Sequence, residues 1–171
     1  MTQESLTLAS LPSGSAVFLD ANVFIYAVFG DSKFGDACNK LLARIEDEDI
    51  RGHTSASVLS DTAHRLSTLE ATKVFGWPYQ GIARRLRRHA DEMKSLTGYR
   101  AAIAKIVDSP IVIASISIDL VVRATELSGL HGMLTNDALI LAVMEKLRIT
   151  ALVSADADFD RVPGFTRFAP T

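Results

Sequence analysis

The chain has 171 residues, of which 48% are hydrophobic, and a formal net charge of −2 at pH 7. This length and apolar fraction predict one globular domain with a sizeable core. The small net charge excludes a protein that holds a polyanion by its overall charge, so a nucleic-acid partner would need a local basic patch or bound metal ions. Cys38 is the only cysteine, which excludes an intrachain disulfide and a cysteine-based zinc cluster and indicates a reducing compartment.

The first residues, "MTQESLTLASLPSGSA", have no basic region and only a broken apolar run, unlike a signal peptide. No uninterrupted apolar stretch approaches the ~18 residues that cross a bilayer. We therefore expect a cytoplasmic protein without a membrane partner. Residues 1–14, which contain Pro12 and Gly14, are expected to form a mobile lead before a single domain at residues 15–171.

Short apolar runs alternate with amphipathic stretches along the rest of the chain. The runs predict strands within residues 16–20, 50–56, 109–117 and 150–156, and an edge strand within 164–170. The amphipathic stretches predict helices within residues 22–30, 33–48, 57–69, 119–128 and 135–147, with two helices or one kinked helix between 79 and 107. Such alternation predicts an α/β domain with a mostly parallel central sheet.

Several residues are typical of helix ends. Asn22 is predicted to cap the first helix and Gly30 to end it, and Ser55 or Ser57 to cap the helix that follows the second strand. Residues 70–78 are expected to break the helical pattern, and Gly129 to end the helix over 119–128.

Three aspartates follow the run "LVSADADFDRV" at every second position: Asp156, Asp158 and Asp160. Alternate aspartates are typical of a calcium loop of the EF-hand type. That interpretation fails, because counting from Asp156 the required glycine is Arg161 and the required bidentate glutamate is Arg167.

Two of the acids should meet at one edge of the sheet. Asp20 ends the first strand and Asp156 closely follows another, and ligands of open parallel sheets bind beyond the carboxyl ends of the strands. Asp137 lies in the first turn of its helix, where the helix dipole alone would favour an acid. Asp61 lies early in its own helix and is also placed for an exposed i,i+4 ion pair with Arg65.

Four segments, in this order, resemble the PIN-domain family, especially ribonuclease toxins of the VapC type: "FLDANVFIY", "TSASVLSD", "LTNDALILAVMEKL" and "LVSADADFDRVPGF". The resemblance covers roughly residues 16–69 and 111–171. It implies a three-layer α/β/α domain with a mostly parallel central sheet. It also implies that an acidic quartet binds the catalytic metal: Asp20, Asp61, Asp137 and Asp156. The implied polar neighbours are Asn22, Ser55, Asn136 and Ser154.

Some positions stay open within this resemblance. Asp61 departs from the family's usual glutamate, and its shorter arm leaves direct or water-mediated contact with metal undecided. Asp158 is either a further ligand or the cap of the short turn that holds Phe159. Asp160 is expected to face solvent.

Clustered carboxylates must take up protons or hold a cation, and hard oxygen ligands suit Mg²⁺ or Mn²⁺. The resemblance therefore implies a metal-dependent endoribonuclease that forms a homodimer and pairs with a small antitoxin. The alternatives are a stand-alone PIN ribonuclease of RNA processing and a non-catalytic binding module. A phosphatase of the haloacid dehalogenase type is disfavoured, because Asn22 stands where its second aspartate is expected.

A locally basic segment lies within the predicted helices at residues 79–107. Its cations include a cluster on one short stretch: Arg84, Arg85, Arg87 and Arg88. This segment is either a solvated helix face or an arm that contacts RNA phosphates. The neighbouring Trp77 and Tyr79 either stack on unpaired bases or pack against the protein.

Overall fold

A central sheet of parallel strands organises the computed structural model, which describes residues 6–31 and 33–171. Its strands are β1 (Leu6–Thr7), β2 (Ala16–Leu19), β3 (Arg51–Ser55), β4 (Val112–Ala114), β5 (Ala151–Val153) and β6 (Thr166–Ala169). They lie in the order β1-β6-β5-β2-β3-β4, and each pairing between neighbours is parallel. The predicted α/β class with a parallel sheet is confirmed.

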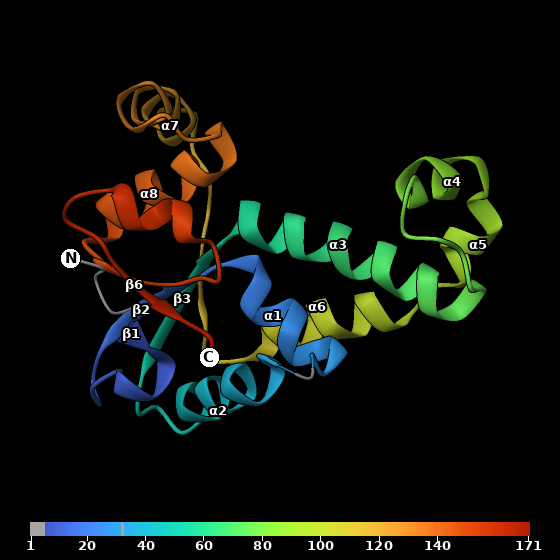
Figure 1. The fold of residues 1–171 in the computed structure, drawn as a ribbon, viewed down its shortest axis with the longest axis horizontal. Helices are drawn as coiled ribbons and strands as arrows, with labels where there is room; N and C mark the ends of the chain where they lie inside the picture. Colours follow the sequence, from blue (N-terminus) through green and yellow to red (C-terminus); the bar gives the residue numbers. More distant parts are fainter. Residues whose placement is uncertain (1–5, 32) are drawn as a thin grey trace.

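Eight helices connect and cover the described strands. They are α1 (Ala21–Phe29), α2 (Gly35–Glu46), α3 (Ala56–Phe75), α4 (Ile82–Arg88), α5 (Ala90–Ser95), α6 (Gly98–Asp108), α7 (Ile118–His131) and α8 (Thr135–Leu147), with 3₁₀ turns at Leu8–Ser10 and Ala157–Arg161. Figure 1 shows α7 and α8 on one side of the sheet and α1, α2 and α6 on the other. This is the three-layer α/β/α arrangement that the sequence predicts.

The segment before residue 15 belongs in part to the sheet. Leu6 pairs with Phe168 across β1 and β6, and the side chains of Leu8 and Leu11 are buried in the core. Apolar burial of this kind holds residues 6–11 against the domain, where the sequence predicts a mobile lead. Residues 1–5 of that predicted lead lie outside the described residues. Because β1 is added beyond it, β6 is not the edge strand that was predicted.

Helix ends agree with the sequence in some places and differ in others. Gly30 ends α1 in the left-handed conformation, with φ of +62°, as predicted, and the Ser55 hydroxyl caps α3. The N-cap of α1 is Asp20, whereas Asn22 is buried inside the first turn. The predicted end of α7 at Gly129 is also wrong, because this helix continues to His131.

Helix α3 runs for 20 residues, through a stretch predicted to break it, and ends at Phe75. Beyond it, residues 79–107 form three short helices rather than one or two. Figure 1 shows α4 and α5 at the far end of α3, away from the sheet. A small hydrophobic cluster, separate from the main core, fixes them there with Ala71 of α3, Ile82 and Leu86 of α4, and Leu96. The breaking signals of Gly76 and Pro78 therefore act only after Phe75, because residues 70–75 contain the good helix formers Glu70, Ala71 and Lys73.

Glu70 ties α3 to the start of α6. Its carboxylate accepts hydrogen bonds from the backbone N–H groups of Gly98 and Tyr99, both at 2.8 Å, and of Thr97 at 3.2 Å. The approach is close enough that a Cβ on Gly98 would lie 3.0 Å from the Glu70 Oε1 atom. A side chain from one helix therefore serves as the N-cap of another.

Replacing Glu70 with alanine should lower the free energy of unfolding by about 1–2 kcal/mol, because three N–H groups of α6 lose a charged acceptor. Urea unfolding followed by circular dichroism measures the change. Glu46→Ala is the matched control, since this exposed glutamate makes no side-chain hydrogen bond within the described chain. Equal losses for the two variants would contradict the capping role.

No single helix of the described residues is long and apolar enough to cross a membrane. In the part of the chain that the structure describes, α7 and α8 taken together reach that length and apolarity, and they are bent by 113° at the break between them.

Candidate active site

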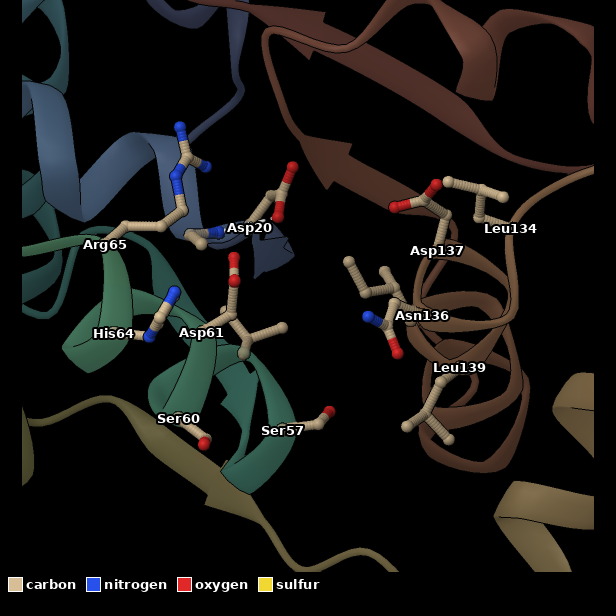
Figure 2. A pocket seen from close by; sticks show the side chains of 13 residues that line it. Asp20, Ser57, Ser60, Asp61, His64, Arg65, Leu134, Asn136, Asp137 and Leu139 are labelled. Atoms are coloured by element: carbon tan, nitrogen blue, oxygen red, sulfur yellow. Dashed lines mark hydrogen bonds between the residues drawn. The ribbon is translucent and has the colours of Figure 1, made fainter. Parts of the chain in front are cut away.

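An open pocket of about 730 Å³ lies beyond the carboxyl end of β2, between the first turns of α1, the first half of α3 and the start of α8. Its polar lining residues are Asp20, Ser57, Ser60, Asp61, His64, Arg65, Asn136 and Asp137. Figure 2 shows Asp61 on α3 and Asp137 on α8 on opposite walls, with Asp20 between them. Three members of the predicted acidic quartet therefore share one pocket.

Asp20 is held by three hydrogen-bond donors. Its Oδ1 atom accepts from the Ala21 N–H at 2.6 Å, and its Oδ2 atom accepts from the Asn22 amide at 2.8 Å and the Ser154 hydroxyl at 2.7 Å. Burial raises the pKa of Asp20 above its ordinary value, although the bonds from Ser154 and Ala21 and the charge of Arg65 lower it. The carboxylate is fixed in place and costly to ionise.

Asn22 and Ser154 form the buried support of this carboxylate. The Asn22 amide also donates to the Ser154 Oγ atom at 3.2 Å, and its Oδ1 atom accepts from the Ala155 N–H at 3.2 Å. Ser154 is fully buried, and its hydroxyl oxygen accepts the Asp156 N–H at 3.0 Å. The two predicted polar neighbours thus join the ends of β2 and β5 to the loop that carries Asp156.

Asp137 is a second acid of the pocket with a raised pKa. Burial, followed by the charges of Asp156, Asp20, Asp158 and Asp61, raises its pKa from 3.8 to about 6. Asp156 does not line the pocket, but it is the strongest charge that acts on Asp137. The charges of the other three predicted carboxylates therefore all act on Asp137.

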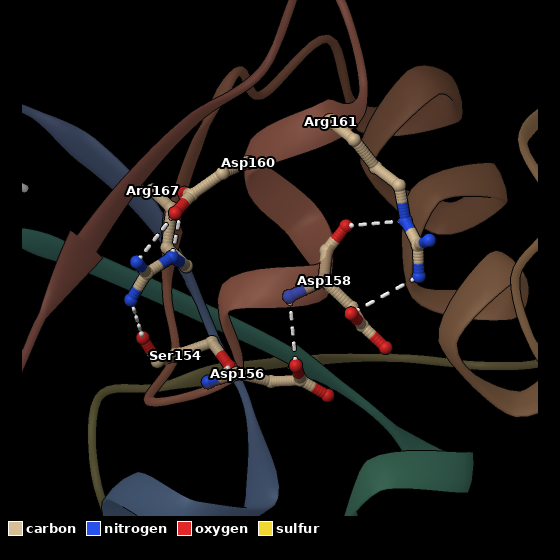
Figure 3. Close-up of polar contacts among 6 residues, drawn as sticks. All are labelled: Ser154, Asp156, Asp158, Asp160, Arg161 and Arg167. Atoms are coloured by element: carbon tan, nitrogen blue, oxygen red, sulfur yellow. Dashed lines mark hydrogen bonds and ion pairs between the residues drawn. The ribbon is translucent and has the colours of Figure 1, made fainter. Parts of the chain in front are cut away.

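The loop after β5 uses its three aspartates differently from the prediction (Figure 3). The Asp156 Oδ1 atom accepts from the Asp158 N–H at 2.8 Å and so caps the turn over Ala157–Arg161. Asp158 is not the cap, and its own carboxylate lies 3.1 Å from the Arg161 guanidinium. Asp156 thus both shapes the loop and adds charge to the pocket.

Asp160 does not simply face solvent. Both of its oxygens accept from the Arg167 guanidinium, each at 2.7 Å, and Arg167 also donates to the Ser154 carbonyl at 3.1 Å. The Arg167 side chain is only 7% exposed, and two-pronged pairs of this kind are the strongest of their class. This pair, visible in Figure 3, fastens the loop to β6 beside the site.

The remaining predicted residues fall into two groups. Asn136 lines the pocket at the start of α8, whereas Ser55 is buried and its hydroxyl serves the cap of α3. Asp61 is exposed on its pocket wall, and the alternative ion pair with Arg65 is absent from the ion pairs of the described chain.

Sequence reasoning missed four polar residues of α3 that also line the pocket: Ser57, Ser60, His64 and Arg65. For all but Ser60, the spacing from Asp61 provides a signal, because residues three and four apart share one face of a helix. His64 and Arg65 lie three and four residues after Asp61. They bring cationic or hydrogen-bonding groups to an otherwise acidic wall.

The donor chemistry of the pocket suits a hard divalent cation. No three histidine, cysteine, aspartate or glutamate side chains within residues 6–31 and 33–171 lie close enough together to ligate one ion on their own. Mg²⁺ commonly binds through one or two carboxylates and keeps several waters, so Asp20 with Asp137 or Asp61 meets its requirement. Burial and then the neighbouring negative charges raise the pKa of Asp137, and such an ion would neutralise those charges.

The basic cluster is exposed and lies on α4, which projects from the far end of α3. Of its arginines, Arg85 lies over the Trp77 ring, 5.2 Å from the centroid. Trp77 also packs against Phe75, with 4.7 Å between ring centroids, so its main contacts are with the protein. Tyr79 is 62% exposed.

Comparison with known proteins shows which family the chain belongs to. A profile of the PIN domain matches residues 17–164. The chain belongs to the PIN-domain family. Ribonuclease VapC6 of Methanocaldococcus jannaschii is 25% identical over 164 residues, which cover 88% of this chain and 94% of that relative.

Solved structures share the PIN fold. One is VapC20 of Mycobacterium tuberculosis, a toxin that cleaves the sarcin-ricin loop, with a TM-score of 0.59, 20% identity and coverage of 84% of this chain and 92% of that one. Another is VapBC2 of Rickettsia felis bound to a promoter DNA fragment, with a TM-score of 0.57, 16% identity and coverage of 90% and 98%. The predicted family is confirmed.

The raised pKa of Asp137 predicts how the metal-free PIN domain responds to pH. The pKa of Asp137 is about 6 in the folded state, against an ordinary value of 3.8 for the unfolded chain. Its ionisation therefore leaves the folded state's stability unchanged below pH 3.8 and lowers that stability progressively as the pH rises from there through 6. In EDTA at pH 7.5, the Asp137→Asn variant should therefore be more stable than wild type. Its free energy of unfolding should be higher by about 1 kcal/mol, after allowance for solvent screening of a half-exposed group.

The difference should vanish at pH 3.5, and urea unfolding at the two pH values measures it. Asp108→Asn, an exposed change at the end of α6, is the control and should track wild type at both. An Asp137→Asn variant that is less stable than wild type at pH 7.5 would contradict the charge crowding.

Proposed function

We propose that this PIN domain is a metal-dependent endoribonuclease that hydrolyses RNA phosphodiester bonds and is the toxin of a type II toxin–antitoxin pair. The observation that carries the proposal is the convergence of Asp20, Asp61 and Asp137 in one pocket, with Asp156 near enough to raise the pKa of Asp137. The likeness to ribonuclease VapC6 supports the same activity.

The carboxylates and Arg65 of the pocket have different roles in the proposed mechanism. Asp20, fixed by three donors, would hold the ion, and Asp137 and Asp61 would offer further carboxylates from opposite walls. When bound, Mg²⁺ or Mn²⁺ lowers the pKa of a water and offsets charge that develops on the phosphate and the leaving oxygen. Arg65, whose charge acts on Asp20, reduces the repulsion between the acidic walls and an incoming phosphate.

Cleavage of an RNA panel by purified, antitoxin-free protein tests the proposal. With Mg²⁺ or Mn²⁺ the protein should cut at least one RNA, and EDTA should abolish the cutting. Asp20→Asn and Asp137→Asn should each lose most of the rate because they remove ligand charge, and Asp108→Asn is the matched control that should keep it. Folding of each variant is checked by circular dichroism. Cutting that persists in EDTA, or that survives both pocket variants, would contradict a metal-dependent mechanism.

The arginines of α4 are proposed to hold the RNA backbone. They are exposed, they form no ion pair within the described chain, and they lie on a projecting helix in a chain whose net charge is only −2. Phosphate contacts of this kind give affinity with little sequence choice.

Neutralising all four to glutamine should weaken RNA binding and flatten its salt dependence. Each lost phosphate contact lowers the slope of log affinity against log salt by about 0.7 for a single strand, so four contacts account for up to about 3. Fluorescence anisotropy over a salt series measures the slope. The control is Lys40→Gln with Lys146→Gln, two exposed changes away from α4, which should leave it unchanged. An unchanged slope in the α4 variant would remove these residues from the interface.

The partners implied by the family are part of this proposal. A small antitoxin that covers the pocket would silence a toxin of this kind, and a homodimer is proposed as its resting form. The apolar side chains of Ile118, Leu130 and Leu134 are each more than 70% exposed and are available for contact with such a partner.

A further inference from the structure

A second pocket, of about 380 Å³, continues along the same helix that carries Asp61. Its lining residues come from three helices of the projecting end: His64, Ser67 and Thr68 of α3, Ala83, Leu86 and Arg87 of α4, and Met93 of α5. His64 lines both this pocket and the acidic one. The two hollows are therefore neighbours, with His64 between them.

The walls of this second pocket differ from those of the acidic one. Leu86 is buried in the small hydrophobic cluster and Met93 packs against it, so part of the surface is apolar. The Ser67 and Thr68 hydroxyls donate to backbone carbonyls of α3 at 2.8 and 2.9 Å, and their oxygens keep lone pairs that can accept. Arg87 is exposed and forms no ion pair within the described residues. The pocket thus combines an apolar wall, hydroxyl oxygens and a free cation.

This combination fits a nucleobase with its phosphate better than other occupants. A base is a flat ring with a hydrogen-bonding edge, and single-stranded RNA is recognised through such exposed rings and edges. Apolar and sulfur-containing side chains provide contact for the ring face, and an arginine pairs with a phosphate oxygen. The volume also falls in the range of ~300–1,000 Å³ typical of sites for small ligands.

We propose that the second pocket is a base subsite, which binds an unpaired nucleotide next to the bond that is cut; this inference rests on the ribonuclease activity proposed above. Thr68 lies seven residues beyond Asp61, or about 10 Å along a helix. That distance corresponds to about three nucleotides at ~3.4 Å each when they are stacked. The subsite selects single-stranded RNA and places its backbone on the arginines of α4.

Binding of short oligoribonucleotides with a single abasic position tests the subsite. Binding is measured in EDTA, which removes the metal that cleavage requires, and the abasic position is moved one nucleotide at a time. In wild type, loss of the base at one position within three nucleotides of the cut should weaken binding about 5- to 150-fold, the range that stacking of one base supplies. Other positions should cost little. Fluorescence anisotropy gives each dissociation constant.

Two pairs of variants separate the subsite from general effects. Ala83→Leu fills the pocket from α4 and should erase the positional penalty, whereas Ala104→Leu, an exposed change on α6 outside both pockets, should keep it. Arg87→Gln should weaken the positional penalty more than Arg84→Gln, because both remove one charge from α4 but only Arg87 lines the pocket. The arginine pair keeps the test valid if Ala83→Leu does not fold.

The outcomes distinguish this inference from the proposed function. A positional penalty that Ala83→Leu and Arg87→Gln both diminish supports the subsite. Wild-type protein that cuts RNA, but shows equal penalties at all positions or the same pattern in all four variants, overturns the subsite and leaves the nuclease standing. Protein that neither binds nor cuts any RNA overturns both.

Discussion

The parallel pairing of β2 with β5 is the constraint on which the site depends. Leu19 lies opposite Val153, and the Asp20 N–H continues the pairing by donating to the Val153 carbonyl at 3.1 Å. The next residues on the two strands, Asp20 and Ser154, are 134 positions apart in the sequence, yet their side chains meet at 2.7 Å. Parallel neighbours need a crossover connection, so this contact forms only when the intervening chain has folded. The geometry of the carboxylates is therefore a property of the whole domain.

The clustered carboxylates at this edge of the sheet destabilise one another when ionised, and the fold supports them differently. Asp20 receives three hydrogen bonds, which hold its carboxylate in one orientation. Asp137 accepts no side-chain hydrogen bond within the described chain, and its pKa is raised to about 6. A fixed carboxylate facing less constrained ones suits an ion that must also accept waters and a phosphate. Charge crowding that reduces stability is common where a site must bind an opposite charge.

The sequence predicts those features of the site that follow from local rules. Asp20 and Asp156 could be placed because strands that carry an acid at their carboxyl ends converge in a parallel sheet. The order of β1 and β6 could not, because a two-residue strand leaves almost no pattern. The sequence also does not show that Asp156 rather than Asp158 is the cap, because both are followed by residues able to form a turn. In the structure the Asp156 carboxylate accepts the capping hydrogen bond, whereas the Asp158 carboxylate contacts Arg161.

Long-range contacts account for the larger errors. The pairing of Asp160 with Arg167 joins a loop to a strand, and no spacing rule for helices or strands anticipates it. The length of α3 was underestimated because residues 70–78 contain helix-breaking signals. Its last turns are stabilised instead by packing of Ala71 against α4 and by the bonds from Glu70 to α6, neither of which leaves a periodic trace.

That extra length of α3 links the site to the projecting helices. Asp61 faces the acidic pocket, and Glu70, nine residues later, caps the start of α6. About 14 Å of continuous helix therefore separates the pocket from this cap. A helix of this kind does not stretch or bend easily, whereas a loop of equal length would let α4 move freely. Packing of α4 against Ala71 therefore holds the arginines in place relative to the helix that carries Asp61. In the proposed function, an RNA strand held both at the carboxylates and at the arginines would have to match the spacing that α3 sets between them.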